Sequence, residues 1–199
     1  TRVMLDINKS HKAVRVGFHP GGLHRLMGLS MADMIDGNYD AADIFGNEIQ
    51  EVNNQLQEAE DFDAIRSIVE RFLLQKVKKL KQALPFDKAM LELLRLNGNV
   101  SIEKIASLAC LSLRQFERVS KERIGLPPKL FARLIRFSKA YRMRENFPLL
   151  SWTQIAYECG YFDQMHFIRD FKQFAGVAPG ILEKELENTP VRLQADLRL

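Results

Sequence analysis

SLRQFERVSKERIGLPP, residues 112–128, is the stretch that decides the fold, because its pattern returns 51 positions later as DQMHFIRDFKQFAGVAP, residues 163–179. Five positions are identical in the two copies: Phe116 and Phe167, Arg118 and Arg169, Lys121 and Lys172, Gly125 and Gly176, Pro128 and Pro179. Each copy follows a short helical segment that begins Ile-Ala, at residues 105 and 155. The repeat therefore predicts two similar helix pairs in tandem.

A long helix is predicted between the two copies. Pro127 and Pro128 favour its start, and Pro148 favours an end near Asn146. At 1.5 Å per residue, roughly 19 residues span about 28 Å, and successive major-groove windows on one face of B-DNA lie about 34 Å apart. The sequence thus predicts a mainly all-α fold in which a long helix joins two helix-turn-helix subdomains and can hold two DNA-reading helices.

The second helix of the first pair is predicted to have one apolar and one polar face. Leu113, Phe116 and Val119 recur at spacings of three and form the inward face. The outward face carries the candidate DNA-binding residues Arg114, Glu117, Arg118 and Lys121. Arginine can hold guanine through two hydrogen bonds and glutamate can accept one from cytosine, whereas lysine more often contacts phosphate. The competing interpretation is a solvated ion pair between Glu117 and Lys121, which contributes only about 0.2–0.5 kcal/mol.

The second helix of the second pair repeats this design with fewer base-reading groups. Its core face is formed by Phe167, Phe171 and Phe174. Its candidate DNA-binding residues are Gln164, His166, Arg169 and Lys172. The positions that match the first two candidates of the first copy hold Met165 and Ile168, which can at most pack on thymine methyl groups. We therefore expect the first copy to carry more of the sequence discrimination and the second more of the backbone anchoring, while His166 is equally compatible with a plain surface histidine.

Charge is distributed unevenly along a chain whose formal net charge is +4. Residues 26–65 contain ten Asp or Glu and no Lys or Arg, whereas residues 114–144 contain ten Lys or Arg and two Glu, a local net charge of +8. Such a cationic segment is typical of proteins that bind a phosphate backbone. Two other interpretations stay open: a solvated helix face, and an autoinhibited interaction scaffold in which the acidic half docks on the basic half and masks it.

The first 84 residues are predicted to form a separate part of the chain. Alternating apolar and polar residues at 1–18 predict a β-hairpin, short acidic helices follow, and Asp61 can cap a longer helix that runs to about Leu84. The apolar stripe of that helix either packs against the acidic helices or forms the seam of a homodimer. The predicted organisation is an N-terminal remnant at 1–84, a DNA-binding domain at 85–188 and a loose tail at 189–199.

Composition excludes several classes of protein. No stretch of the 199 residues approaches the roughly 18 apolar residues of a membrane span, and no secretory pattern opens the chain, so we expect a cytoplasmic protein without a membrane partner. Cys110 and Cys159 each end the first helix of a pair and are predicted to be small buried apolar residues. Because no metal-ligand spacing, cofactor motif or catalytic triad is present, we expect no metal, no cofactor and no enzymatic activity.

The two copies and their connection, RQFERVSKERIGLPPKLFARLIRFSKA and IAYECGYFDQMHFIRDFKQFAGVAP, resemble the AraC/XylS family of bacterial transcription regulators over about residues 86–182. The part of the match from Gly160 to Pro179 is highly specific to that family. The resemblance implies a monomeric seven-helix DNA-binding domain, double-stranded DNA as the partner and RNA polymerase as a further partner. The chain departs from the family at Ser120, where phenylalanine is usual, so Val119 or Ile124 is expected to compensate in the packing.

Upstream, VRVGFHPGGLHRLMGLS at residues 14–30 resembles the end of the cupin-like N-terminal domain of some family members. That resemblance implies that most of a ligand-holding barrel is missing from this chain, and the effector ligand does not follow from these residues. An enzymatic alternative within the family is fusion to a DNA-alkylation repair methyltransferase, which needs a reactive cysteine. Neither cysteine lies in an activating context. The operator sequence, the choice between activation and repression, and the oligomeric state do not follow from the sequence either.

Overall fold

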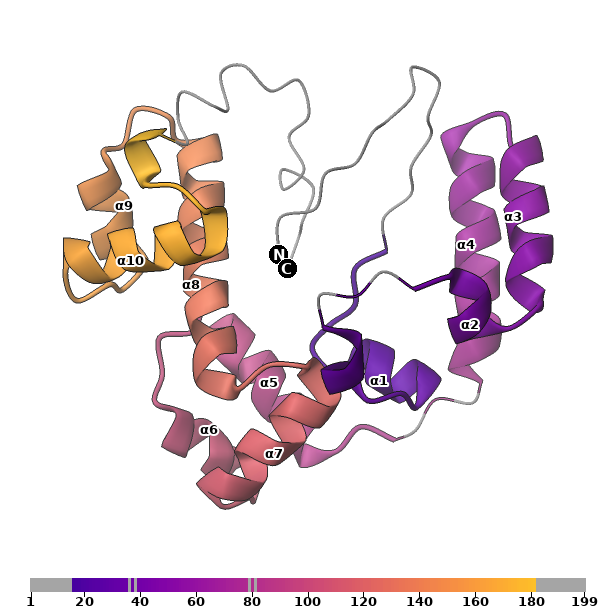
Figure 1. The fold of residues 1–199 in the computed structure, drawn as a ribbon, viewed down its shortest axis with the longest axis horizontal. Coiled ribbons are helices and arrows are strands. Elements are labelled where there is room, and N and C mark those ends of the chain that lie inside the picture. The colour runs from indigo at the N-terminus through magenta and orange to yellow at the C-terminus, as the bar shows by residue number, and fades with distance from the viewer. Residues whose placement is uncertain (1–15, 36, 38, 79, 81, 182–199) are drawn as a thin grey trace. The chain divides into compact units, whose positions relative to one another are not determined.

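The computed structural model describes residues 16–35, 37, 39–78, 80 and 82–181, drawn in colour in Figure 1. The regular secondary structure of these residues is entirely helical, which confirms the predicted all-α class. The β-hairpin predicted at residues 1–18 lies almost wholly outside the described residues, and the tail predicted at 189–199 lies outside them entirely.

The chain divides into two compact units. The first comprises residues 1–82 with 122–125, and the second comprises residues 83–121 with 126–199. The helices of the first unit are α1 Gly22–Met27, the 3₁₀ helix η1 Met31–Met34, α2 Ala41–Phe45, α3 Glu48–Glu58 and α4 Phe62–Val77. The remaining helices are α5 Pro85–Arg95, α6 Ile102–Leu108, α7 Leu113–Ile124, α8 Pro128–Asn146, α9 Trp152–Glu158 and α10 Gln164–Ala175. They belong to the second unit, except that the last residues of α7 cluster with the first.

In the first unit, α4 packs along α3 (Figure 1). Asp61 caps α4 as predicted, because its carboxylate accepts the backbone N–H of Ala64 at 2.8 Å. Phe72 of α4 is buried, and its ring centroid lies 5.3 Å from that of Phe45. Phe62, at the start of the predicted apolar stripe, is 71% exposed. The stripe is therefore buried only in part within the unit.

The helix α4 ends at Val77 and is shorter than the predicted helix, which runs to about Leu84. The next helix explains why residue 84 is not part of α4. Pro85 begins α5, and a proline ring drives the preceding residue out of the helical region. Leu84 accordingly has φ −93° and ψ 164°, and its backbone N–H donates to Asp87 Oδ2 at 2.7 Å. It serves as the N-cap of α5 and cannot extend α4.

A hydrophobic core around α5 holds the first helix pair, α6 and α7. The largest fully buried side chains of this core are Met90, Leu93, Ile105 and Phe116. The ring of Phe86 in α5 lies 5.2 Å from that of Phe116 in α7, centroid to centroid. Ser101 caps α6 as predicted, accepting the backbone N–H of Lys104 at 3.3 Å.

The inward face of α7 differs from the predicted spacing of three. Leu113, predicted to point inward, is 42% exposed, because it is the first residue of the helix and lies at the edge of the core. Phe116 and Ser120, one helical turn apart, are both fully buried. The Ser120 hydroxyl donates to the backbone carbonyl of Leu126 at 2.7 Å, so this polar side chain is satisfied inside the core. The residues expected to compensate for it are only half-buried: Val119 and Ile124.

The second helix pair, α9 and α10, packs on α8 (Figure 1). Its core consists of Phe137, Ala140, Ile155, Ala156, Cys159, Tyr161, Phe167 and Phe171, with Phe174 partly buried against them. Ser151 and Gln154 form a reciprocal capping box, in which the Ser151 Oγ accepts the Gln154 N–H at 3.2 Å and the Gln154 Oε1 accepts the Ser151 N–H at 2.9 Å. Asp163 caps α10 by accepting the backbone N–H of His166 at 2.7 Å.

The turns inside the two pairs share a left-handed position. Cys110 in the α6–α7 turn has φ 56°, and Gly160 in the α9–α10 turn has φ 75°. Each follows the C-cap of its helix, so Cys159 corresponds to Ala109 rather than to Cys110. Cys159 is buried as predicted. Cys110 is exposed, contrary to the prediction, because this turn position lies on the surface in both pairs.

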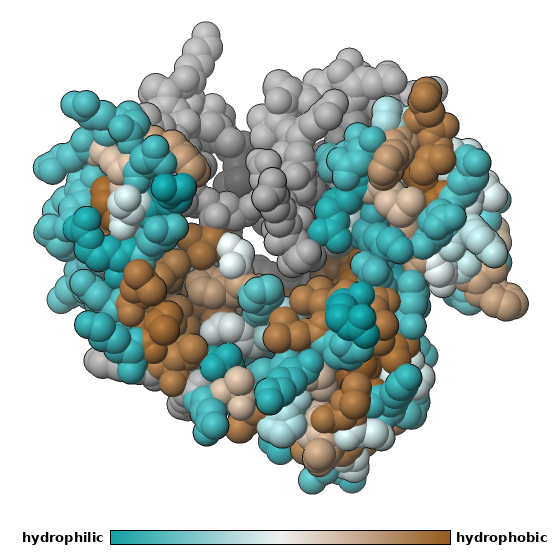
Figure 2. All heavy atoms as spheres, turned by 180° about the vertical axis from the view of Figure 1, so that it is seen from behind, coloured by the Kyte–Doolittle hydropathy of each residue, from teal (hydrophilic) through white to brown (hydrophobic). Residues whose placement is uncertain are grey.

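Apolar side chains are exposed among polar ones on the face seen in Figure 2. The most exposed large hydrophobic residues of the second unit are Tyr157, Phe162 and Leu149, at 81%, 95% and 99%. Within the described part of the chain, no helix combines the length and the apolar character that crossing a membrane requires.

Candidate nucleic-acid interface

The exposed side of α7 carries all four residues predicted from the first copy: Arg114, Glu117, Arg118 and Lys121. Ser112 precedes the helix and its Oγ accepts the backbone N–H of Gln115 at 3.3 Å, which fixes where α7 begins. Arg114 is consequently in the first turn, where the helix dipole is positive. The dipole opposes a cation there unless an anionic partner such as a DNA phosphate is near.

The exposed side of α10 carries the four residues predicted from the second copy: Gln164, His166, Arg169 and Lys172. His166 Nδ1 lies 3.5 Å from Asp163 Oδ2, so its imidazole has a carboxylate neighbour at the start of the helix. Met165 is 69% exposed and Phe162, just before the helix, is 95% exposed. Ile168, in contrast, packs against the core of the second pair.

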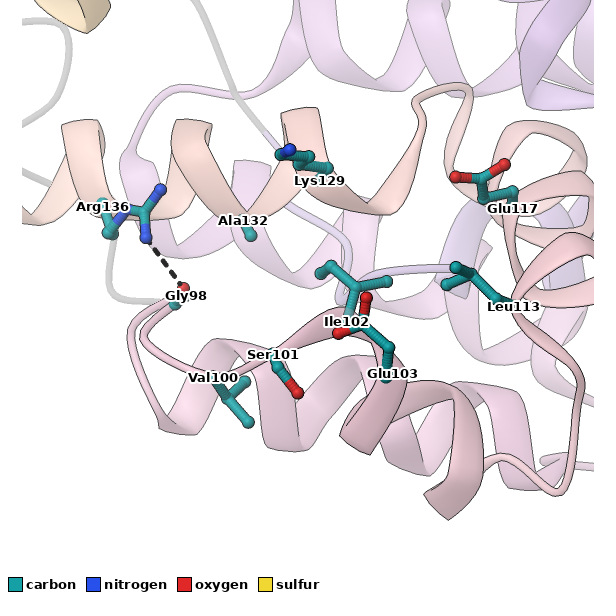
Figure 3. Close-up of a pocket in the computed structure, with 10 residues that line it drawn as sticks. All are labelled: Gly98, Val100, Ser101, Ile102, Glu103, Leu113, Glu117, Lys129, Ala132 and Arg136. Carbon is teal, nitrogen blue, oxygen red and sulfur yellow. Dashed lines mark hydrogen bonds between the residues drawn. The ribbon is translucent and has the colours of Figure 1, made fainter. Parts of the chain in front are cut away.

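A depression of about 430 Å³ lies between α8 and the first helix pair (Figure 3). Glu117 of α7 and Glu103 of α6 line it on one side, and Lys129 and Arg136 of α8 line it on the other. Glu117 is the one predicted contact residue that this depression includes. Lys129 and Arg136 of α8 therefore line the same depression as Glu117 of α7.

A second depression, of about 600 Å³, lies between α8 and the second helix pair. His166 and Arg169 of α10 line it, and Lys129 and Arg136 of α8 line it too. The two depressions thus share the same two cations of α8 and bring three predicted residues beside them. The other predicted residues line neither depression: Arg114, Arg118, Lys121, Gln164 and Lys172.

Three basic residues of α8 line these depressions but were absent from the predicted contact set: Lys129, Arg133 and Arg136. Their spacing of i, i+4 and i+7 places them on one face of a helix, and this spacing was the available sequence signal. Two of them also have protein partners. Arg133 binds Asp170 and Gln173 of α10, and Arg136 lies over the Tyr161 ring at 5.6 Å from its centroid.

Burial governs the ionisation of two groups in the second unit. It raises the pKa of the Cys159 thiol to about 11, despite the nearby Lys139 cation. Burial likewise raises the pKa of the Tyr161 hydroxyl.

In the described residues, no group of three His, Cys, Asp or Glu side chains could hold a metal ion. The interface offers cations, hydrogen-bonding side chains and exposed apolar groups, which are the groups that bind phosphates and base edges.

A short helix, a turn and a second helix with an exposed polar face define the class of helix-turn-helix DNA-binding proteins. Residues 105–185 match the family model of a helix-turn-helix domain. This match and the curated relatives confirm, over this region, the resemblance of the chain to the AraC/XylS family of bacterial transcription regulators. No solved structure matches the chain.

Curated relatives match the same region. The chain is 36% identical over 80 residues to the HTH-type transcriptional activator RhaS of Escherichia fergusonii, a match that covers 40% of this chain and 28% of the relative. It is 36% identical over 74 residues to RhaS of Enterobacter sp. (strain 638), covering 37% and 26%. It is 31% identical over 86 residues to an uncharacterised HTH-type transcriptional regulator of Haemophilus influenzae, covering 43% and 28%. The match thus spans little more than a quarter of these relatives.

Proposed function

We propose that this protein is a sequence-specific transcription regulator that binds double-stranded DNA by placing α7 and α10 in neighbouring major grooves. One observation carries the proposal: all eight predicted contact residues are exposed, and they lie on two helices that α8 connects. The 19 residues of α8 correspond to about 28 Å of helix, which approaches the separation of about 34 Å between successive grooves.

Base recognition is assigned mainly to α7. Arg114 and Arg118 are suited to the two acceptors of guanine, and Glu117 is suited to the amino group of cytosine. Lys121, one turn further along, is assigned to phosphate. On α10, Gln164 and Arg169 are assigned to base edges, and the other two residues anchor the backbone: His166 and Lys172.

Two competing functions have less support. A repair methyltransferase needs a reactive thiolate, and Cys159 is unsuited because it is buried and its pKa is raised to about 11, which leaves the exposed Cys110 as the one candidate thiol. A masked interaction scaffold is not favoured by the relatives, whose names describe transcription regulators. Comparing the DNA affinity of residues 85–188 with that of the whole chain tests masking, because masking requires the fragment to bind more tightly.

The test of the proposed function is selection of bound duplexes from a random pool, followed by footprinting at fixed salt. We expect an operator with two protected stretches about 10–10.5 base pairs apart. The identical positions of the two copies allow a matched comparison, in which Arg118→Ala weakens protection of one stretch and Arg169→Ala that of the other. Arg66→Ala, on α4, removes an exposed arginine outside this region and serves as the control.

A footprint confined to one groove, or equal affinity for all sequences, contradicts the proposal. Homodimerisation and contact with RNA polymerase stay predictions of the same proposal. Homodimerisation is supported by the exposed apolar residues of α4, which are Phe62, Leu74 and Val77. Sedimentation of the wild type and of a Leu74→Ser variant measures it.

A further inference from the structure

The turn that leads into the first helix pair is hydrogen-bonded directly to the second pair. Asn99, in the turn between α5 and α6, donates a hydrogen bond from Nδ2 to the backbone carbonyl of Cys159 at 3.0 Å. Cys159 is the C-cap of α9 and lies 60 residues further along the chain. The helix α8 connects the two pairs covalently, and this hydrogen bond connects them a second time.

Glycine at position 160 leaves room for Asn99. A Cβ built on Gly160 would lie 2.5 Å from Asn99 Nδ2, closer than real Cβ contacts. The left-handed conformation of this position does not by itself require glycine, because Cys110 holds the equivalent position with φ 56° and an exposed side chain. The space taken by Asn99 is therefore what distinguishes Gly160 from Cys110.

The same turn is held against α8 on its other side. Gly98 is buried with φ +72°, and a Cβ there would collide with the backbone carbonyl oxygen of Ala132 in α8. The carbonyl of Gly98 faces Arg136 Nη1 at 3.5 Å, as Figure 3 shows. The Arg136 guanidinium in turn lies over the ring of Tyr161, the neighbour of Gly160. Gly98 thus contacts α8, and Asn99 next to it contacts the turn that precedes α10.

We propose that Asn99 is a positioning residue that fixes the separation and the angle between α7 and α10, and thereby the spacing of the two DNA half-sites that the protein accepts. The inference rests on the proposed function, in which the two helices read neighbouring grooves. Asn99 moves with the first pair, because α5 shares a core with α7, whereas Cys159 and Gly160 immediately precede α10. Long helices bend gently, and a second connection beside α8 restricts that bending.

The experiment measures affinity at fixed salt for duplexes in which base pairs are added or removed one at a time between the half-sites of the selected operator. The wild type is expected to prefer one spacing. Asn99→Ala removes the donor at an exposed position, where substitution is compatible with folding. Its preference for that spacing is expected to fall about threefold to tenfold, which corresponds to one net hydrogen bond, while its affinity for a single half-site is unchanged.

Gly160→Ala and Gly176→Ala supply a matched pair of variants. Both positions are left-handed, with φ +75° and +77°, so both substitutions carry similar backbone strain. Nothing lies within 4 Å of a Cβ at position 176, whereas a Cβ at position 160 meets Asn99. Only Gly160→Ala is therefore expected to change the preferred spacing, and thermal unfolding of both variants measures the shared strain.

The possible results distinguish a failure of the proposed function from a failure of the role of Asn99. A wild type that binds one half-site as tightly as two overturns the proposed function, and the role of Asn99 with it. A wild type that discriminates between spacings, together with an Asn99→Ala variant that discriminates equally well, overturns the role of Asn99 alone. If one variant does not fold, the spacing preference of the other, Asn99→Ala or Gly160→Ala, decides by itself.

Discussion

Arg133 on α8 donates two hydrogen bonds to a single carboxylate oxygen of Asp170 on α10, from Nε at 3.0 Å and from Nη2 at 2.7 Å. The same Nη2 donates to Gln173 Oε1 at 2.5 Å, and the guanidinium lies 5.6 Å from the centroid of the Phe174 ring. The Asp170 side chain is only 7% exposed and that of Arg133 is 26% exposed. A charge-assisted contact of low exposure thus joins α10 to α8.

Asp170→Ala is expected to lower the free energy of unfolding by about 1–3 kcal/mol, because it leaves the Arg133 guanidinium partly buried without its anion. Urea unfolding of the second unit measures the change. Glu92→Ala is the control, since Glu92 pairs with Arg95 on the surface and exposed pairs contribute little. Equal losses in the two variants would show that the contact with Asp170 has no special weight.

Ser120→Ala is expected to destabilise the protein by about 1 kcal/mol, because the Leu126 carbonyl loses its donor inside the core. Ser120→Phe, which restores the usual residue of the family, is expected to cost about 1–3 kcal/mol through overpacking of a fully buried site. Thermal unfolding followed by circular dichroism measures both. A phenylalanine variant more stable than the wild type would mean that the site has room for the ring.

Cys110→Gly is expected to raise the free energy of unfolding by about 0.5–1 kcal/mol, because glycine relieves the left-handed strain at this position and gives back part of the gain as chain entropy. Cys110→Ala keeps the Cβ and should bring no such gain. Denaturant midpoints of the two variants decide the matter, and a gain with alanine as large as that with glycine would rule out backbone strain as the cause.

Cys159 is expected to resist thiol reagents in the folded protein. Its pKa of about 11 instead of 9.0 means that its thiolate fraction below pH 9 is about a hundredfold smaller than that of an ordinary thiol. In a Cys110→Ser variant, labelling at pH 8 should therefore wait for unfolding. Rapid labelling of the native variant would contradict the burial of this thiol.

The same shift makes stability depend on pH. The folded-state pKa of Cys159 is raised, so the stabilisation from its neutral thiol is complete below pH 9 and is lost as the pH rises toward 11. The free energy of unfolding should fall over that interval in the wild type. In Cys159→Ala it should fall less, because the remaining fall comes from other groups that titrate there.

Arg114→Ala is expected to relax discrimination at one base position by about 1–3 kcal/mol, whereas Lys121→Ala should weaken all sequences alike and lower the salt slope by about one. The difference follows from the proposed roles, in which Arg114 binds a base and Lys121 binds phosphate. Affinities of both variants for the operator and its single-base variants, at two or more salt concentrations, test the assignment. Exchanged behaviour of the two variants would reverse the roles.

The helices of the second unit were predictable because residues that act on their own neighbours mark the helix ends. The long helix predicted from the proline pair to near Asn146 is found at Pro128–Asn146. Ser101 in the second unit, and Asp61 in the first, act as the caps expected of them. The eight polar residues predicted on the outer faces of α7 and α10 are likewise exposed, because helical periodicity fixes which residues share a face.

Contacts between segments distant in the sequence were not predictable. No local pattern links Asn99 to Cys159, and none shows that Lys129 and Arg136 border both depressions. The prediction that Cys110 is buried was wrong because the two cysteines were treated as equivalent positions. The first helices of the two pairs are offset by 50 residues, which aligns Cys110 with Gly160, whereas Cys159 follows Cys110 by only 49 positions and aligns with Ala109.

The buried Ser120 has a consequence for how α7 is aimed. An aromatic ring fills volume and tolerates sliding, since dispersion depends weakly on orientation, whereas a hydroxyl bound to the Leu126 carbonyl is satisfied only over a narrow range of directions. At this site, a directional hydrogen bond therefore stands in place of the packing of an aromatic ring. The orientation of α7 against the turn before α8 is therefore set by the direction of this hydrogen bond as well as by side-chain packing.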